Sequence, residues 1–533
     1  MAESDLNTLD IEPPSIDAAV FIPSGLMVFL VGVSLVVWPE QAAQIASTLM
    51  NAVTSNFGWL FSAVAFTTLI FCFWLAFGRY GQVKLGQPGD TPEFSEISWA
   101  GMMFSAGIGI GLVSWAFVEP MIYFQAPPLG IASATSQAAE WAHMYTMFHW
   151  GFVPWALYAL PTIPIAYMLY VRKSPFLRIS HASNGAIPRP EHRKWDPVID
   201  TLVIIGIVGG AGTSLGLGVP LVSAFVGELT GLKDGFGLQV LVLTFWTLIF
   251  ATSVYRGLKS GIKWLASVNI GLAILVLVFI LLVGPTVFIL TLSANSFGLL
   301  IDNFFRMSFW LDPIDQSDFP RDWTLFYWAW WIAYAPLMGL FFGRISRGRT
   351  IKQTILGIIG WGSLGCVLFM SICGGYALHL ELNGILPVND IIDKEGNPAA
   401  VVAIVSTLPG STLAITIFTI LSFIFLATTL DSVAYVLASI TTKNLPGDEE
   451  PNRLNRLVWA FFLAFIAVGL LVVGGLTTVQ SSSVVTSLPL IPVMFLLAVS
   501  TLRWLRSDFG DLVDRPILSM RVLDDGNKEI VQE

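Results

Sequence analysis

Apolar runs of roughly 20 residues, the length that crosses the hydrocarbon core of a bilayer, recur about twelve times along the chain. They fall near 18–38, 57–78, 98–124, 142–171, 198–229, 237–256, 264–292, 323–343, 354–378, 411–441, 455–476 and 480–502. With 55% hydrophobic and only 12% charged residues, the chain has more apolar surface than one water-soluble core would bury. Because backbone polar groups inside lipid must bond within their own segment, we expect an all-α integral membrane protein.

Lys and Arg gather on one side of these predicted helices. If the N-terminus is cytoplasmic, most of the 27 Lys and Arg residues fall in the tails and the even-numbered loops, as the positive-inside rule requires. We therefore expect a multi-pass protein of the cell inner (plasma) membrane with both termini cytoplasmic. It would have a short tail over 1–17, a transmembrane domain over 18–506 and a second tail over 507–533. The net charge of −9 then indicates no acidic or basic partner, and no nucleic acid.

Residues that would make a catalytic or metal centre are scattered. The five His residues are spread along the chain, and the three Cys residues all fall inside apolar runs, where a thiol usually acts as a small hydrophobic group. The sequence has no zinc-ligand spacing, no arguable Ser/His/Asp arrangement and no phosphate-binding glycine loop followed by Lys. We expect neither an enzyme nor an ATP-driven pump, and no cofactor.

Two of the predicted helices, the third and the eighth, have interrupted interiors. The third contains Gly107, Gly109 and Gly111, and the eighth contains Pro336, Gly339 and Gly343. Helices five apart enter the membrane from opposite sides, which is typical of an inverted repeat of five plus five helices with a substrate site near the midplane. We expect repeat one over about 98–292 and repeat two over about 323–506, with two extra helices before them. Close packing between helices is the alternative explanation for the three glycines of the third helix.

Aromatic residues gather inside the eighth and fourth predicted helices. On the eighth, an arc of roughly 120° holds Trp323, Tyr327, Trp330, Trp331 and Tyr334. On the fourth lie Trp150, Trp155 and Tyr158. An interfacial belt or plain core packing also collects aromatic residues, but a belt places them at helix ends. Ring faces that converge near the midplane would form a cage for a cation without hydrogen-bond donors, such as a quaternary ammonium group.

Acidic residues are almost absent from the predicted helices. The clearest is Asp431, and such acids are functional-site candidates by default. One turn earlier, Phe425, Thr428 and Thr429 share a helix face, and one carbonyl with two hydroxyls would make an oxygen-rich half-site for Na⁺. Hydroxyls that only bond back to the preceding turn are the alternative. A second acid, Glu119, at the far end of the third helix, is expected to pair structurally or to face water rather than to relay protons.

Four segments resemble the betaine/choline/carnitine transporter family. They are FSAGIGIG at 104–111, MFHWGFVPWALY at 147–158, FYWAWWIAYAP at 326–336 and RISRGRT at 344–350. The resemblance covers nearly the whole chain, and the tryptophan-rich segment with the basic motif after it is its most specific part. It implies twelve transmembrane helices, a LeuT-like inverted-repeat core in the third to twelfth, and usually a homotrimer.

The resemblance also implies two sites. Carried over by position, the aromatic substrate box consists of Trp150, Trp155, Tyr158 and Trp331, with Trp330 and Tyr334 beside it along the permeation path. A sodium site between the broken third helix and the tenth is implied at Ser105, Ile108, Phe425, Thr428 and Thr429.

A few positions depart from the family pattern. Tyr334 stands where betaine carriers often have Trp, and Ser114 lies where an aromatic residue often follows the glycine motif. We therefore expect a pocket shaped for something other than plain glycine betaine, in which a hydroxyl binds a carboxylate or an alcohol. Gly111 is intact where proton-coupled choline carriers have Asp, and Asn269 stands where sodium-independent carnitine exchangers have Arg. Both favour sodium coupling.

The sequence thus predicts a sodium-coupled secondary symporter that works by alternating access. Its substrate would be a small onium compound of the betaine, carnitine, choline or dimethylsulfoniopropionate type, and Na⁺ would be the coupling ion. The first alternative is an ion-independent antiporter of the same family that exchanges substrate for product. The second is a ligand-gated channel with an aromatic cage, although nothing in the sequence makes a continuous polar pore.

Overall fold

The computed structural model describes residues 13–107, 109–174, 176–187, 192–256, 259–446, 449–510, 518–522 and 528–532. These residues are mostly helical, and their strands form two short antiparallel pairs, so the predicted all-α class is confirmed. Ten described helices are long and apolar enough to cross a membrane, and one bent pair of helices makes an eleventh. The chain is therefore a multi-pass membrane protein.

The helices follow the chain in two groups. Before residue 310 lie α1 (Ala18–Val37), α2 (Pro39–Phe77), α3 (Glu96–Gly107), α4 (Ile110–Gln125), α5 (Ser136–Trp150), α6 (Phe152–Ala166) with a π-helical end (Tyr167–Val171), α7 (Ile179–Ala182), α8 (His192–Thr230), α9 (Phe236–Arg256), α10 (Lys259–Val283) and α11 (Thr286–Phe309). After it lie a π-helical turn (Pro320–Leu325), α12 (Phe326–Ile345), α13 (Ile351–Phe369), a second π-helical turn (Met370–Gly374), α14 (Gly375–Leu382), α15 (Val388–Glu395), α16 (Asn397–Ser406), α17 (Ser411–Ile440), α18 (Arg453–Val473), α19 (Leu476–Ser487) and α20 (Leu490–Phe509).

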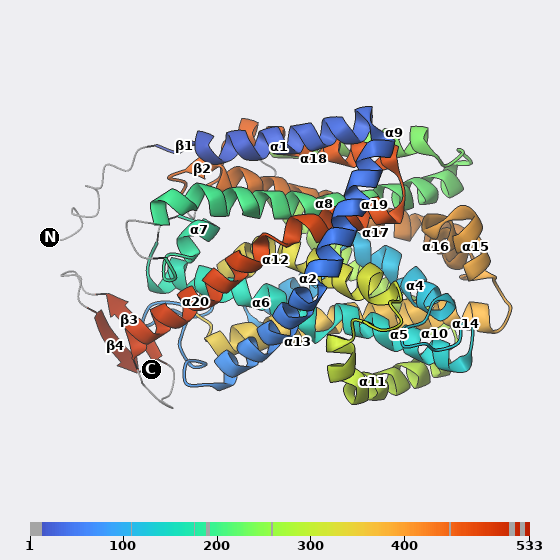
Figure 1. Cartoon of the computed structure of the whole chain (residues 1–533), viewed down its shortest axis with the longest axis horizontal. Helices are drawn as coiled ribbons and strands as arrows, with labels where there is room; N and C mark the ends of the chain where they lie inside the picture. The colour runs from blue at the N-terminus through green and yellow to red at the C-terminus, as the bar shows by residue number, and fades with distance from the viewer. Residues whose placement is uncertain are drawn as a thin grey trace.

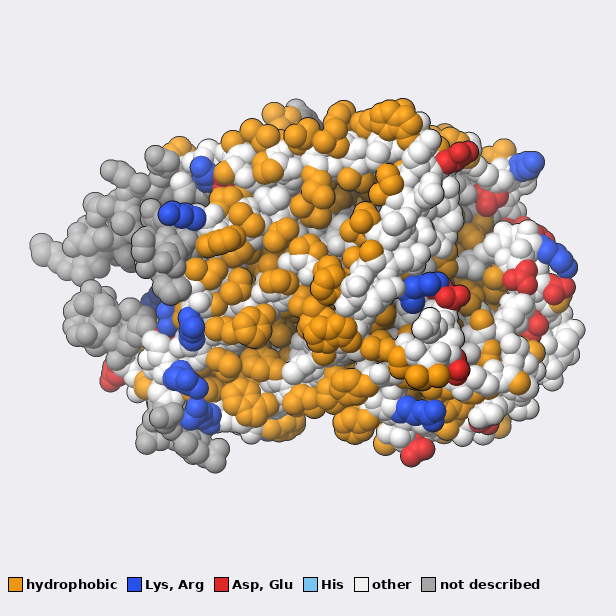
Figure 2. Space-filling view, viewed as in Figure 1, with side chains coloured by type: hydrophobic (Ala, Val, Ile, Leu, Met, Phe, Trp, Pro, Cys, Tyr) orange, Lys and Arg blue, Asp and Glu red, His pale blue; other side chains and the backbone are white. Residues whose placement is uncertain are grey.

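Most long helices run along the long axis of the molecule, and α2 crosses them obliquely (Figure 1). The beginning of α1 and the end of α20 lie at one end of the molecule, while α15 and α16 lie at the other (Figure 1). Apolar side chains cover the middle of the face shown in Figure 2. Lys and Arg gather at its left end and also occur toward the right, where most of the acidic side chains lie (Figure 2). This distribution is that of a protein whose apolar girdle faces lipid.

The predicted apolar runs lie on helices, but some cross a helix boundary: 264–292 runs from α10 into α11, and 480–502 from α19 into α20. The sixth and seventh runs correspond to α9 and α10, whose described apolar stretches, 236–249 and 268–283, are shorter than a full span. Among the described residues, ten of the twelve predicted runs therefore correspond to candidate spanning helices, and α11, which lies mostly outside the predicted runs, is an eleventh candidate. The total of twelve stays a prediction. The division into two inverted repeats also stays a prediction.

The predicted interruption of the third span is confirmed. The axes of α3 and α4 differ by 60°, and Gly109 at the start of α4 has an extended backbone. Ile108, one of the predicted sodium ligands, lies outside the described residues.

The predicted interruption of the eighth span is wrong. Helix α12 continues through Pro336 to Ile345. Its two glycines serve close packing instead: a Cβ atom at Gly339 would lie 2.8 Å from Pro161, and one at Gly343 would lie 2.9 Å from Ile165, both on α6. Close packing between α12 and α6 therefore accounts for these two glycines.

The two predicted tails contain ordered structure where they are described. Strand β1 (Ser15–Ile16) pairs antiparallel with β2 (Thr442–Lys443), directly after α17. The next residue, Asp17, donates its backbone N–H to the carbonyl of Thr441 at 2.8 Å, and its carboxylate lies 2.9 Å from Arg178. In the second tail, β3 (Leu518–Val522) and β4 (Lys528–Gln532) form an antiparallel pair.

Candidate functional site

A kink between α5 and α6 positions the aromatic residues of the fourth predicted span. Trp150 and Trp155 are five residues apart, which would separate them by roughly 140° on an unbroken helix. The helix is interrupted at Gly151, where a Cβ atom would lie 2.6 Å from the carbonyl oxygen of Met147. Glycine, which has no side chain, therefore fits this close contact. The interruption of the helix allows the indole rings of Trp150 and Trp155 to reach the same partner on α12.

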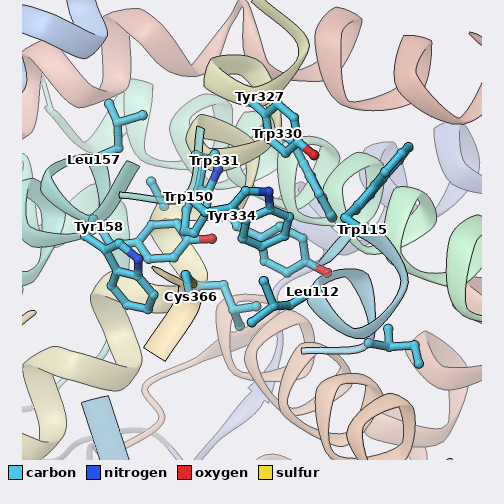
Figure 3. Close-up of a cluster of buried hydrophobic side chains, with 14 of the residues drawn as sticks. Leu112, Trp115, Trp150, Leu157, Tyr158, Tyr327, Trp330, Trp331, Tyr334 and Cys366 are labelled. Carbon is cyan, nitrogen blue, oxygen red and sulfur yellow. The ribbon is translucent and has the colours of Figure 1, made fainter. Parts of the chain in front are cut away.

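That partner is Trp331, which lies at the centre of the aromatic cluster (Figure 3). Its ring centroid is 5.6 Å from that of Trp150, 5.6 Å from that of Trp155 and 4.8 Å from that of Tyr158. All four side chains are buried. The structure thus brings together the four residues predicted as the substrate box, which we call the aromatic box from here on.

Trp330 and Tyr334 extend the aromatic box toward α8. The ring of Trp330 lies 5.9 Å from that of Trp150, and its indole N–H donates to the carbonyl of Gly210 at 3.3 Å. The hydroxyl of Tyr334 lies 2.8 Å from that of Ser214, within hydrogen-bonding distance. Ser114 is buried on α4, and in the described part of the chain its hydroxyl makes no hydrogen bond to these aromatic residues.

Glycines on neighbouring helices make room for the rings. A Cβ atom at Gly111 would lie 2.8 Å from the Trp330 ring, and one at Gly362 on α13 would overlap the ring of Trp155. Gly109, two residues before Gly111, has no atom within 4 Å of such a Cβ position. The third glycine of the predicted motif therefore accommodates an aromatic side chain, whereas the second leaves backbone uncovered at the helix break.

An acid adjoins the aromatic box. The side chain of Glu119 is fully buried, and its Oε2 atom accepts from the indole N–H of Trp150 at 2.9 Å and from the hydroxyl of Tyr327 at 2.5 Å. The predicted structural pairing of Glu119 is confirmed, but its position beside the aromatic box was missed. The available signal was the rarity of acids within apolar spans. Spacing along the chain does not show that α4, α5 and α12 meet there.

Asp431 has a different environment from the one expected of a functional acid. Its carboxylate lies 3.4 Å from the guanidinium of Arg456 on α18, and the same guanidinium lies 3.3 Å from Glu450. Asp431 is thus one member of an ion-paired group that joins α17 to α18. The intramembrane acid that lies beside the aromatic box is Glu119.

The predicted sodium residues of α17 share one carbonyl. The hydroxyls of Thr428 and Thr429 donate to the backbone oxygen of Phe425 at 3.1 and 2.8 Å, so the back-bonding alternative describes their hydrogen bonds. Three oxygen atoms nevertheless lie together on one helix face. Ser105 is half-buried near the end of α3, and the described residues show no hydrogen bond between it and this group. They also contain no cluster of three or more His, Cys, Asp or Glu residues suited to a metal ion.

A bundle of many membrane-spanning helices, with a broken helix beside a buried aromatic site, defines a membrane transporter as the class of protein. The family model for betaine/carnitine/choline family transporters matches residues 19–510, and the chain therefore belongs to this family.

Three relatives illustrate the range of the family. The chain is 34% identical to the uncharacterized transporter YeaV of Escherichia coli K12, over 82% of this chain and 91% of the relative. It is 31% identical to a carnitine transporter of Acinetobacter baumannii, over 93% and 90%. It is 32% identical to an ectoine/hydroxyectoine transporter of Virgibacillus pantothenticus, over 91% and 96%.

Proposed function

We propose that the protein imports a small onium compound by sodium-coupled symport through alternating access. The observation that carries the proposal is the contact of Trp331 with Trp150, Trp155 and Tyr158. Electron-rich rings attract a cation that cannot donate hydrogen bonds, by about 0.5 to 2 kcal/mol for each favourable contact. The name of one relative, a carnitine transporter, supports the same substrate class, since carnitine carries a quaternary ammonium group.

The hydroxyl pair of Tyr334 and Ser214 would recognise the other end of the substrate. Each hydroxyl both donates and accepts a hydrogen bond, so together they suit a carboxylate or an alcohol. Ser114 on α4 is a third candidate for this role. Trp330, held by its bond to Gly210, would form the wall between the aromatic box and this polar end.

Sodium would bind between α17 and the broken third span. The Phe425 carbonyl and the hydroxyls of Thr428 and Thr429 would supply three oxygen ligands, and the carbonyls of Ser105 and Ile108 would supply the others. An interrupted helix leaves backbone carbonyls without intrahelical partners, and transporters use such carbonyls to coordinate coupling ions. Binding of Na⁺ would thereby link the two repeats in one conformation.

The placement in the membrane follows from charge. The end of the molecule where the described chain begins and ends carries Lys and Arg with few acidic side chains on the face shown, whereas Lys and Arg at the other end lie among acidic ones (Figures 1 and 2). This asymmetry supports cytoplasmic termini in the inner membrane. Membership of the family supports a homotrimer in the lipid bilayer. The functional unit would then be three copies, each with its own aromatic box.

Reconstitution in liposomes tests the proposal. We expect radiolabelled onium substrate to accumulate in empty liposomes only under an inward sodium gradient. Accumulation that needs internal substrate and ignores sodium would favour the antiporter. Currents far above carrier turnover would favour the channel, and no uptake of any onium compound would refute the substrate class. An enzyme activity is not part of the proposal.

A further inference from the structure

The environment of Glu119 goes beyond simple structural pairing. Its carboxylate accepts from two aromatic donors, Trp150 at 2.9 Å and Tyr327 at 2.5 Å. Trp150 belongs to the aromatic box, and the ring of Tyr327 lies 5.6 Å from that of Trp150. A fully buried carboxylate therefore touches the N–H edge of a ring whose faces contribute to the proposed substrate site.

His149 completes the surroundings of Glu119. Its Nδ1 atom lies 3.5 Å from Glu119 and 3.0 Å from the hydroxyl of Tyr123, and its Nε2 atom lies 3.0 Å from the hydroxyl of Thr324. A neutral imidazole needs one donor and one acceptor as partners, and two hydroxyls supply both. His149 thus needs no positive charge to complete its hydrogen bonds. In the described part of the chain, no Lys or Arg forms an ion pair with Glu119.

A buried negative charge without a cationic side chain is costly unless something else balances it. The proposed substrate brings a cation to the other side of the same indole. A carboxylate that accepts from an indole N–H makes that ring more electron-rich, which strengthens the attraction of its faces for a cation. In a site without bulk water the charges also attract each other directly, because the effective dielectric constant is low.

We propose that Glu119 is the counter-charge of the onium site and acts on the substrate as a positioning residue, through Trp150. This inference rests on the proposed function. It implies that the preference for a positively charged head group over an uncharged group of the same shape depends on Glu119. Packing against the aromatic rings alone would give the charged group and the uncharged group nearly equal affinity.

Matched ligand pairs test this. Choline and glycine betaine are compared with 3,3-dimethylbutan-1-ol and 3,3-dimethylbutanoate, in which carbon replaces the charged nitrogen, by binding to the purified full-length protein. We expect Glu119→Gln to lower the ratio of cation affinity to isostere affinity about tenfold, while isostere binding changes little. Glu140→Gln is the matched control, because Glu140 is an exposed acid on α5, and it should leave the ratio unchanged.

Each result decides between the possibilities. Equal losses for both members of a pair would assign Glu119 to packing and overturn the inference, as would an unchanged ratio. If Glu119→Gln does not fold, Tyr327→Phe replaces it: the carboxylate loses one donor and keeps its bond to Trp150, so a larger ratio supports the inference and an unchanged or smaller ratio overturns it. Wild-type protein without any preference for the cations would instead refute the proposed function.

Discussion

The indole N–H of Trp150 donates to the carboxylate of Glu119 across 2.9 Å, and this bond joins the end of α5 to the interior of α4. The Trp150 ring also lies 5.9 Å from that of Trp330 and 5.6 Å from that of Trp331, both in T-shaped contacts. One side chain therefore connects the half-helix after the break, the kinked fourth span and α12. The predictions below test the groups that these three segments bring together.

Trp331 is the central ring of the aromatic box. We expect Trp331→Ala to lower onium affinity by about 1 to 2 kcal/mol, and Trp331→Phe to lower it less, because Phe keeps a ring face. Isothermal titration with the purified protein measures both. Trp361→Ala is the control, since Trp361 is 44% exposed on α13. Unchanged affinity in a folded Trp331→Ala protein would remove this residue from the site.

Gly111 and Gly109 form a matched pair at the helix break. A methyl group at Gly111 would meet the Trp330 ring at 2.8 Å, whereas one at Gly109 would meet no atom within 4 Å. We expect Gly111→Ala to displace Trp330 and to cost roughly 1 to 3 kcal/mol of stability or substrate affinity, and Gly109→Ala to cost little. Thermal unfolding with and without choline separates the two effects. Equal behaviour of both variants would contradict this account.

The contact between Gly111 and the Trp330 ring also affects the substitution Gly111→Asp. The sequence suggests this substitution as a way to change the coupling ion, because proton-coupled choline carriers have Asp at this position. The new side chain would have to displace the same Trp330 ring before its carboxylate could bind a proton. We therefore expect loss of substrate binding rather than proton-driven uptake. Binding and uptake measured at several pH values distinguish these results, and acid-stimulated uptake with intact binding would show that the ring adapts.

The two threonines of α17 are tested together. We expect Thr428→Ala combined with Thr429→Ala to abolish the stimulation of uptake by sodium, because both hydroxyls are removed while the Phe425 carbonyl stays. Thr419→Ala is the control: its hydroxyl bonds back to Ile415 at 2.7 Å on the same helix but lies more than two turns away. Sodium-dependent uptake by the double variant would place the ion elsewhere.

The hydroxyl of Tyr334 is tested by its removal. We expect Tyr334→Phe to weaken carnitine and glycine betaine binding by about 0.5 to 1.5 kcal/mol, the net value of one hydrogen bond. Tetramethylammonium, which has no carboxylate or alcohol, should bind with unchanged affinity. Ser214→Ala should show the same pattern, since it removes the other member of the pair. Equal losses for all three ligands would mean that the hydroxyls support the ring and do not contact the substrate.

Much of the fold follows from the apolar runs, because the length of a bilayer and the needs of the backbone leave few choices inside lipid. The sequence pattern also predicts the face of α12 that carries Tyr327, Trp330, Trp331 and Tyr334. Helical periodicity reports which residues share a face, and the structure agrees. Trp323, which belongs to the same predicted arc, instead packs against Trp115, with the two ring centroids 5.5 Å apart.

Other features depend on contacts between helices, which periodicity does not report. Pro336 predicts a break, but α12 continues through it, and the glycines that follow pack against α6. Asp431 and Glu119 are both acids in apolar surroundings. Only the fold shows that one meets Arg456 and the other meets Trp150. The partners of a buried polar group come from elsewhere in the chain, and a single sequence does not name them.

The short pairing of β1 with β2 has a mechanical consequence. It joins the residues before α1 to the residues after α17 by backbone hydrogen bonds. The hydrogen bond from Asp17 to Thr441 extends this connection to the C-terminal end of α17. Arg178 attaches the same point to α8 through Asp200, at 2.9 Å. If α17 tilts relative to α1 while the substrate path opens and closes, the β1–β2 pair must either move with α17 or break. If it breaks, the free energy of these bonds would contribute to the barrier between the open and closed orientations of α17.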